Sequence, residues 1–167
     1  MKLAVGDVVV YGTHGVGRVS AREEKVVTGA TQEVVVIELH DGLTVTLPLD
    51  RARTQLRPLA TDAVMKRVRS ALREDCALSV DPWLSRRREL VEKMAGGDLV
   101  RLAEIVSEGA QRERMRRAKG GTQQLSPGER EVFVKARNLL SDEIALVLGL
   151  QPAAADGWID VQLARQD

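Results

Sequence analysis

One stretch of the chain combines a large apolar ring with clustered guanidinium groups. Trp83 is followed about one helical turn later by Arg86, Arg87 and Arg88. Asp81-Pro82 precedes the ring and can begin a helix, because aspartate accepts an orphan backbone N–H and proline has none to lose. Flexible cations at a helix start can reach phosphates while an apolar ring inserts between bases. The pattern therefore favours a wedge for nucleic acid.

The same stretch also has a purely structural interpretation. On a helical wheel Trp83 falls near Leu90 and Met94, so periodicity alone favours a partly buried core tryptophan. Runs of charged residues are usually solvated helix faces, and arginines among many glutamates can form surface salt bridges of little consequence. The exposure of the indole ring and of the arginines separates the two interpretations.

The distribution of charge is more informative than its total. The 167 residues include 25 basic and 24 acidic side chains, so no overall field indicates a polyanionic partner. Residues 58–120, however, contain 14 basic and 10 acidic side chains, whereas residues 1–57 are balanced and residues 121–167 are acidic. The positive excess therefore surrounds Trp83, as a local phosphate-facing patch requires.

Two different hydrophobic periods divide the chain. Short β-branched runs bounded by glycine occupy residues 5–56 and predict a small, strongly bent SH3- or Tudor-like β-barrel, in which Asp41-Gly42 supplies a tight hairpin. From Thr61 the apolar spacing becomes helical, and Ser126 with Glu129 forms a capping box. We therefore expect a multidomain α+β protein, with a β-barrel at 1–57 and an all-α domain of four to five helices at 58–167.

Chemistry for catalysis or cofactor binding is missing from the sequence patterns. Gly12 to Gly17 lies between strands without the lysine of a phosphate loop, and His14 and His40 have no second ligand at metal spacing. The single Cys76 cannot form an internal disulfide. Neither a signal peptide nor a bilayer-spanning run is evident. We expect a cytoplasmic, non-enzymatic protein that uses no cofactor, metal, small-molecule substrate or membrane.

Several short motifs occur in a characteristic order and spacing. They are Val5-Gly6-Asp7-Val8-Val9-Val10-Tyr11 with His14-Gly15, Thr28-Gly29, Leu43-Thr44-Val45, Leu47-Pro48, Trp83 with Arg86, Glu92-Lys93-Met94-Ala95-Gly96-Gly97-Asp98, and Leu125-Ser126-Pro127-Gly128-Glu129-Arg130 with Lys135-Ala136-Arg137. Together they run nearly end to end, and the chain resembles the CarD family of bacterial RNA-polymerase-binding transcription regulators.

The resemblance implies that the N-terminal barrel is the polymerase-interacting module, similar to one in the transcription-repair coupling factor. Such a module pairs an edge strand with the polymerase β subunit, so that backbone groups supply affinity and side chains supply choice. The corresponding positions here are Lys25, Val27 and Thr46. Family members commonly carry arginine in place of Lys25 and Thr46. Lys25 keeps the positive charge but lacks the planar guanidinium group, and Thr46 lacks the charge. An ordinary barrel edge is the alternative.

For the helical domain, the resemblance implies that Trp83 enters the DNA minor groove at the upstream edge of the melted promoter bubble. The neighbouring basic positions Arg86, Arg88, Arg112 and Arg130 would hold the duplex backbone without reading its sequence. Ser85 stands where many members carry another arginine. The expected protein is a transcription regulator that is associated with the nucleoid through RNA polymerase and stabilises the promoter open complex.

Two other functions remain open at this point. A protein-only adaptor would bury Trp83 in its core and dock another protein on the helical domain. A diverged paralogue would compete with a standard family member for the polymerase β lobe, and the departures at Lys25 and Thr46 are compatible with that role. An enzyme would need a polar cleft with perturbed titratable groups, and no constellation for one occurs in the sequence.

Overall fold

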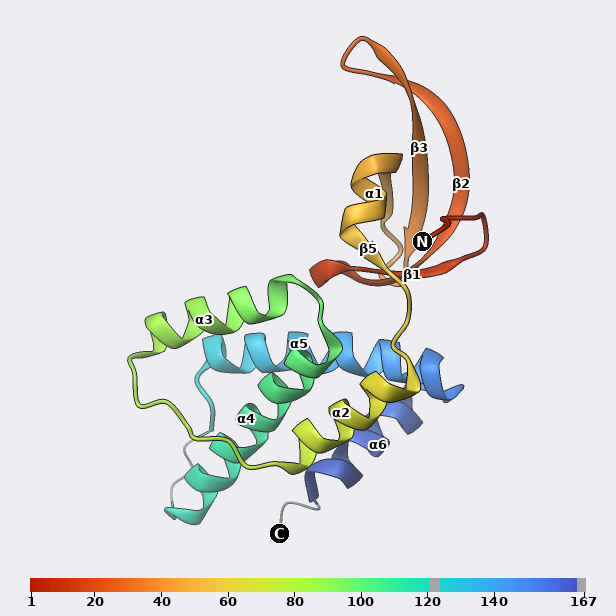
Figure 1. Cartoon of the computed structure of the whole chain (residues 1–167). Helices are drawn as coiled ribbons and strands as arrows, with labels where there is room; N and C mark the ends of the chain where they lie inside the picture. Colours follow the sequence, from red (N-terminus) through yellow and green to blue (C-terminus); the bar gives the residue numbers. More distant parts are fainter. Residues whose placement is uncertain (121–123, 165–167) are drawn as a thin grey trace. The chain divides into compact units, whose positions relative to one another are not determined.

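The computed structural model describes residues 1–120 and 124–164 and divides the chain into two compact units, Met1–Leu59 and Ala60–Asp167. The first unit is a five-stranded antiparallel sheet and the second is helical (Figure 1). This arrangement confirms the predicted α+β fold. The predicted boundary after residue 57 lies just before the observed division.

The first unit is a strongly curved sheet with strand order β4-β3-β2-β1-β5. Its elements, in chain order, are β1 (Val8–Tyr11), the 3₁₀ turn η1 (Gly12–His14), β2 (Gly15–Val27), β3 (Ala30–Leu39), β4 (Thr44–Pro48), α1 (Leu49–Gln55) and β5 (Leu56–Arg57). The long hairpin of β2 and β3 is visibly bent in Figure 1. A register shift between Val19 and Ala21 contributes to this bend, because a bulge increases local twist.

Two tight turns set the register of this sheet. Thr28 and Gly29 join β2 to β3 and both have positive φ angles, 52° and 84°, as a two-residue hairpin of the mirror-image type requires. Gly42 has a φ of 86°, and the Leu43 amide donates to Asp41 Oδ1 at 3.0 Å. The predicted turn at Asp41-Gly42 is therefore confirmed.

The core of the first unit is aliphatic and includes part of a helix that the sequence patterns did not predict. Val9, Val19, Val35 and Ile37 are completely buried in this core. The prediction that residues 5–56 contain only strands is wrong at Leu49–Gln55, where α1 inserts Ala52 into the same core. A helix of two turns is too short for its 3.6-residue period to stand out from a strand pattern.

The second unit contains five helices within the described residues, the upper end of the predicted range. They are α2 (Asp62–Arg73), α3 (Trp83–Ala95), α4 (Leu99–Ala118), α5 (Pro127–Leu148) and α6 (Pro152–Leu163). Thr61 accepts from the Val64 amide and begins α2. At α5 both halves of the predicted capping box are present, from Ser126 and Glu129.

The start of α3 differs from its prediction. Pro82, not Asp81, occupies the N-cap position of α3, and no side chain caps the helix there. The Asp81 carboxylate instead accepts from the Ser79 hydroxyl at 2.8 Å. Because this local bond competes with capping, the first turn of α3 is held by other contacts, which are described below.

Helix packing in this unit is mainly aliphatic. Leu72, Leu102, Ile105, Leu140 and Ile144 form a core with almost no exposed surface.

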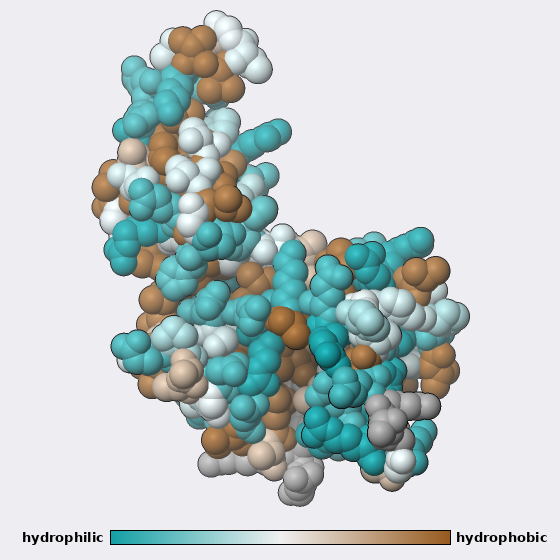
Figure 2. Space-filling model, turned by 180° about the vertical axis from the view of Figure 1, so that it is seen from behind, coloured by the Kyte–Doolittle hydropathy of each residue, from teal (hydrophilic) through white to brown (hydrophobic). Residues whose placement is uncertain are grey.

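Figure 2 shows one face of the molecule, where hydrophilic residues predominate and smaller apolar patches lie between them. Among the described residues no single helix has the length and apolarity to cross a membrane; α5 and α6 meet this test only as a pair, bent by 107°.

Two helical glycines in this unit are expected to respond oppositely to alanine. A Cβ at Gly109 of α4 would lie 2.7 Å from Phe133 Cγ, close to the root of a rigid side chain, whereas a Cβ at Gly157 of α6 would meet nothing within 4 Å. Overpacking outweighs the gain in helix propensity, so Gly109→Ala should cost about 1–2 kcal/mol, and Gly157→Ala should stabilise by about 0.5–1 kcal/mol. Urea unfolding of both variants measures this difference, and two shifts of the same sign would contradict it.

Candidate functional site

Trp83 is the first residue of α3 and is only partly buried. Its ring packs against the helical core, and its indole nitrogen Nε1 lies beside the first turn of α5, where a Cβ at Gly128 would be 3.1 Å away. The adjacent Leu84 is 78% exposed. The ring is therefore supported from one side by the core and keeps an accessible part.

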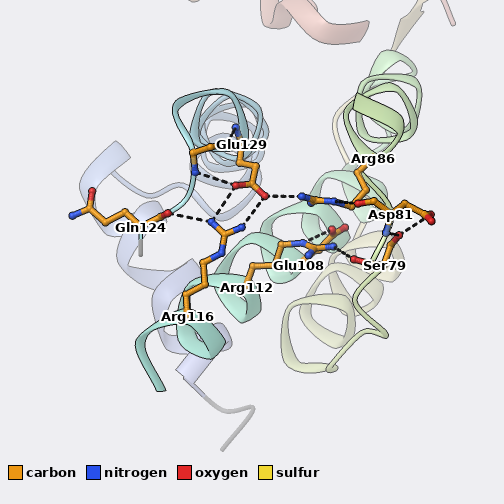
Figure 3. Close-up of polar contacts among 9 residues, drawn as sticks. Ser79, Asp81, Arg86, Glu108, Arg112, Arg116, Gln124 and Glu129 are labelled. Carbon is orange, nitrogen blue, oxygen red and sulfur yellow. Dashed lines mark hydrogen bonds and ion pairs between the residues drawn. The ribbon is translucent and has the colours of Figure 1, made fainter. Parts of the chain in front are cut away.

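Arg86 lies beneath this ring and is itself buried, with 8% of its surface exposed. Its Nη2 donates to Glu129 Oε1 at 2.7 Å, and its Nε donates to the Asp81 carbonyl at 3.1 Å (Figure 3). Its Cζ atom is 5.3 Å from the centroid of the Trp83 ring, within the range of a cation–π interaction. The guanidinium therefore connects the start of α3 to α5.

Glu129 is the acceptor at the centre of this network, with 3% of its surface exposed. Besides Arg86, it accepts from both terminal nitrogens of Arg116 at 3.1 Å and from the Ser126 amide at 3.0 Å (Figure 3). Burial alone would raise the pKa of Glu129, but donation by Arg86, Ser126 and Arg116 outweighs it and lowers the pKa to about 2. The carboxylate is therefore ionised throughout the physiological range.

The arginines predicted to contact DNA fall into two groups. Arg88 and Arg130 are exposed, and Arg130 donates to the Gln124 side chain at 2.6 Å. Arg112, by contrast, has an 11% exposed side chain that pairs with Glu108 at 2.9 Å and also donates to the Ser79 carbonyl. Like Arg86, it is held by internal acceptors, so that Arg88 and Arg130 are the exposed members of the four predicted positions.

The sequence did not predict that two further residues belong to this site. Glu129 was identified only as a helix cap, although its carboxylate also joins Arg86 and Arg116. Arg116 lies in a run of basic residues at the end of α4. Nothing in the sequence near Arg116 indicates that Glu129 accepts its hydrogen bond. The spacing of Glu108 and Arg112, four residues apart with the carboxylate first, is a known helical pair and did carry a usable signal.

The predicted polymerase positions occupy two strands of the first unit. Lys25 and Val27 lie at the far end of β2, and Thr46 lies in β4, the terminal strand on that side of the sheet. Lys25 pairs with Gln32, and Thr46 pairs with Val36 on the same strand β3. Cross-strand partners and residues an even number apart point to one side. The three positions therefore share a face of the sheet but not a single edge.

The described edge of the sheet is open where these residues lie. β1 pairs with β2 only at Gly15–Arg18, so within the described residues the part of β2 beyond the bulge has a strand on one side only. Lys25 is exposed and its Nζ lies 3.0 Å from Glu23 Oε2. Thr46 is also exposed. Both strands thus offer backbone groups that a further strand can pair with.

Each of the two units matches a known protein-family model. Residues 3–60 match the family model described as "CarD-like/TRCF RID domain", and residues 67–160 match "CarD, C-terminal domain". The chain belongs to the CarD family, and its N-terminal unit is the RNA-polymerase-interacting domain of that family.

The chain is similar to a bacterial protein over most of its length and to a solved domain over part of it. The chain is 26% identical over 148 residues to "Putative transcription factor YdeB" of Bacillus subtilis (strain 168). The aligned region covers 87% of this chain and 92% of that protein. The chain is 39% identical to the solution NMR structure of the 72-residue N-terminal domain of Myxococcus xanthus CarD, which covers 35% of this chain and 81% of that domain, with a TM-score of 0.30.

Proposed function

We propose that this protein binds the β subunit of RNA polymerase through residues 1–57 and stabilises the promoter open complex through residues 58–167. The observation that carries the proposal is the position of Trp83, a partly exposed ring at the start of α3 that is backed by a buried ion pair. A protein-only adaptor would use Trp83 as part of its core, whereas a wedge needs the accessible part that the ring keeps. The site of action would be the nucleoid in the cytoplasm.

The wedge acts through a difference in affinity between two states of the promoter. An apolar ring that enters the minor groove must unstack a base step, which costs a few kcal/mol in intact duplex. At the upstream edge of the bubble the bases are already parting, so Trp83 binds the open promoter better than the closed one. A ligand shifts an equilibrium by its differential affinity for the two states, and the open complex is favoured.

Exposed cations of the same unit would hold the DNA backbone. Arg88 and Arg130 are exposed and suited to phosphate contact, and Arg87 beside them is also exposed. Such contacts position the protein on the duplex without reading its sequence. Arg86 and Arg112, predicted to make the same contacts, are internally paired and would support the surface from beneath. We therefore expect weak, nonspecific binding to free duplex DNA.

The sheet unit would supply recruitment by strand addition. The open part of β2 and the terminal strand β4 carry Lys25, Val27 and Thr46 on one face, where side chains could select the partner while backbone groups supply affinity. Recruitment raises the local concentration of the helical unit at the promoter, so weak DNA contacts are sufficient.

Trp83→Ala is expected to shorten the half-life of the promoter open complex about tenfold, since one base–aromatic stack contributes about 1–3 kcal/mol and 1.4 kcal/mol is a factor of ten. Its unfolding free energy should fall only modestly, because the ring is partly buried. Competitor-challenge kinetics on a promoter, combined with thermal unfolding, measure both quantities.

Trp158→Ala is the matched control, because Trp158 is also partly buried in the helical unit and lies near an arginine, with Arg69 Cζ 5.7 Å from its ring. It should lower stability comparably and leave the half-life unchanged. A large loss of stability in Trp83→Ala with an unchanged half-life would instead favour a protein-only adaptor.

A further inference from the structure

We propose that Arg86 is a positioning residue that, together with Glu129, fixes the Trp83 ring before DNA is bound. The proposal assigns Arg86 to the ring and not to a phosphate. Only its consequence for transcription rests on the proposed function, because the positioning itself is a property of the free protein.

Burial and pairing of Arg86 exclude it as a free cation. Its side chain is 10% exposed and that of Glu129 is 3% exposed, and they meet at 2.7 Å. A phosphate would have to displace a carboxylate that is inside the protein and also bound by Arg116. Removing one partner of such a pair leaves an uncompensated buried charge, so the Arg86–Glu129 pair remains intact when DNA approaches the surface.

The ring rests on two surfaces, and Glu129 determines both. One is the guanidinium of Arg86, which Glu129 holds by a hydrogen bond. The other is the first turn of α5 at Gly128, which Glu129 holds as part of the capping box with Ser126. A single carboxylate therefore orients the cation beside the indole and the backbone against which its nitrogen lies.

One atom of Arg86 further ties it to the ring. Nη1 is buried and makes no hydrogen bond within the described residues. A buried donor without an acceptor is normally costly, and cation–π attraction to an indole face offsets part of this cost. A residue selected only to bridge α3 and α5 would not need a cation against the tryptophan, whereas one that positions the ring does.

Positioning matters because Trp83 stands at the start of a helix that has no side-chain cap. A partly exposed ring there can occupy several rotamers. Restricting these rotamers when DNA binds costs free energy, and this cost is smaller for a ring that is already held in one rotamer in the free protein. The supported ring therefore binds parted bases more tightly than a mobile ring of the same chemistry.

The test compares Arg86→Met with Arg116→Met in a Trp158→Phe background, in which Trp83 is the only tryptophan. Both variants remove one arginine from Glu129, but only Arg86 lies against the ring. In the folded full-length protein, without DNA or polymerase, Arg86→Met should red-shift Trp83 emission, increase acrylamide quenching and lower anisotropy. Arg116→Met should leave all three close to the Trp158→Phe parent. Equal changes in the two variants would overturn the proposal.

Two further variants keep the test decisive if Arg86→Met does not fold. Arg86→Lys preserves the charge and should retain part of the wild-type quenching and anisotropy. Gly128→Ala places a Cβ 3.1 Å from the indole nitrogen and keeps both Arg86 and Glu129, and it should alter the emission of Trp83. Unchanged Trp83 emission and quenching in both variants would also overturn the proposal.

Open-complex measurements separate this proposal from the proposed function. The half-life should fall about two- to fivefold in Arg86→Met, as expected from loss of a cation–π contact, and stay close to the parent value in Arg116→Met. If Arg86→Met changes the Trp83 emission and leaves the half-life at the parent value, the positioning role is supported and the wedge mechanism fails.

Discussion

Replacing Glu129 with leucine should destabilise the helical unit by about 3–5 kcal/mol, the range for removing one partner of a buried ion pair. Leucine fits a buried position of this size, but it leaves the Arg86 guanidinium inside the protein with only the Asp81 carbonyl as an acceptor among the described residues. It also removes half of the capping box at α5, which adds about 1 kcal/mol. Urea unfolding followed by helical circular dichroism measures the change.

Glu131→Leu is the matched control for this prediction. Glu131 lies on the same helix α5 but is exposed, and surface substitutions away from special contacts usually stay within about 0.5 kcal/mol of the wild type. If both substitutions had similar small effects, the Arg86–Glu129 pair would contribute nothing to the stability of the unit.

The same carboxylate predicts a dependence of stability on pH. Its pKa is lowered from 4.5 to about 2 in the folded protein, so its contribution is fully present above pH 4.5 and is lost as the pH falls through 2. Glutamine at this position cannot ionise, and the advantage of the wild type over Glu129→Gln should therefore shrink between pH 4.5 and 2. A constant difference across this range would show that Glu129 has an ordinary pKa.

Local sequence signals predicted the elements whose determinants are local. The capping box of Ser126 and Glu129 and the turn at Asp41-Gly42 each depend on a few neighbouring residues, and both were found where expected. α1 escaped prediction because two turns of helix give too little periodicity. The cap expected from Asp81 was lost to the Ser79 hydroxyl, a local competitor only two residues away that can be recognised after the fact.

The roles of the site residues depended on contacts between distant parts of the chain. Arg86 and Glu129 are 43 residues apart in the sequence. A run of basic residues is equally compatible with a solvated helix face and with one partner of a buried ion pair. The aromatic ring was predicted more successfully, because its helical register with Leu90 and Met94 indicated partial burial while its place at the helix start indicated exposure. Pattern alone indicated partial burial of the ring but not which of the neighbouring arginines are exposed.

The polymerase positions show the same limit in the sheet. The family resemblance supplied Lys25, Val27 and Thr46 as one edge, and the strand order separates them across β3. Their common face follows from register, which no single strand reveals. Because backbone pairing would use one edge at a time, the side chains on the shared face are the better target for a test of the polymerase contact.

Reversing charge on this face should impair recruitment more than any substitution in the helical unit impairs DNA contact. In the double variant Lys25→Glu and Thr46→Glu, we expect the protein concentration for half-maximal open-complex stabilisation to rise about 10²-fold or more, because tethering commonly raises apparent affinity by that factor. The family resemblance implies arginine at both positions, so we expect the partner surface to favour cations. Titration of the variant into promoter-opening reactions measures the shift.

The maximal effect of this variant separates recruitment from wedging. Because Trp83 and its supporting residues are unaltered, the open-complex half-life at saturating protein should return to the wild-type value. The control, Lys2→Glu with Thr31→Glu, introduces the same charges in the same unit at exposed positions, and Thr31 points to the opposite side of β3 from Gln32, the partner of Lys25. Equal shifts in the two double variants would place the polymerase contact elsewhere, whereas a lower plateau for Lys25→Glu with Thr46→Glu would mean that the sheet unit contributes to opening itself.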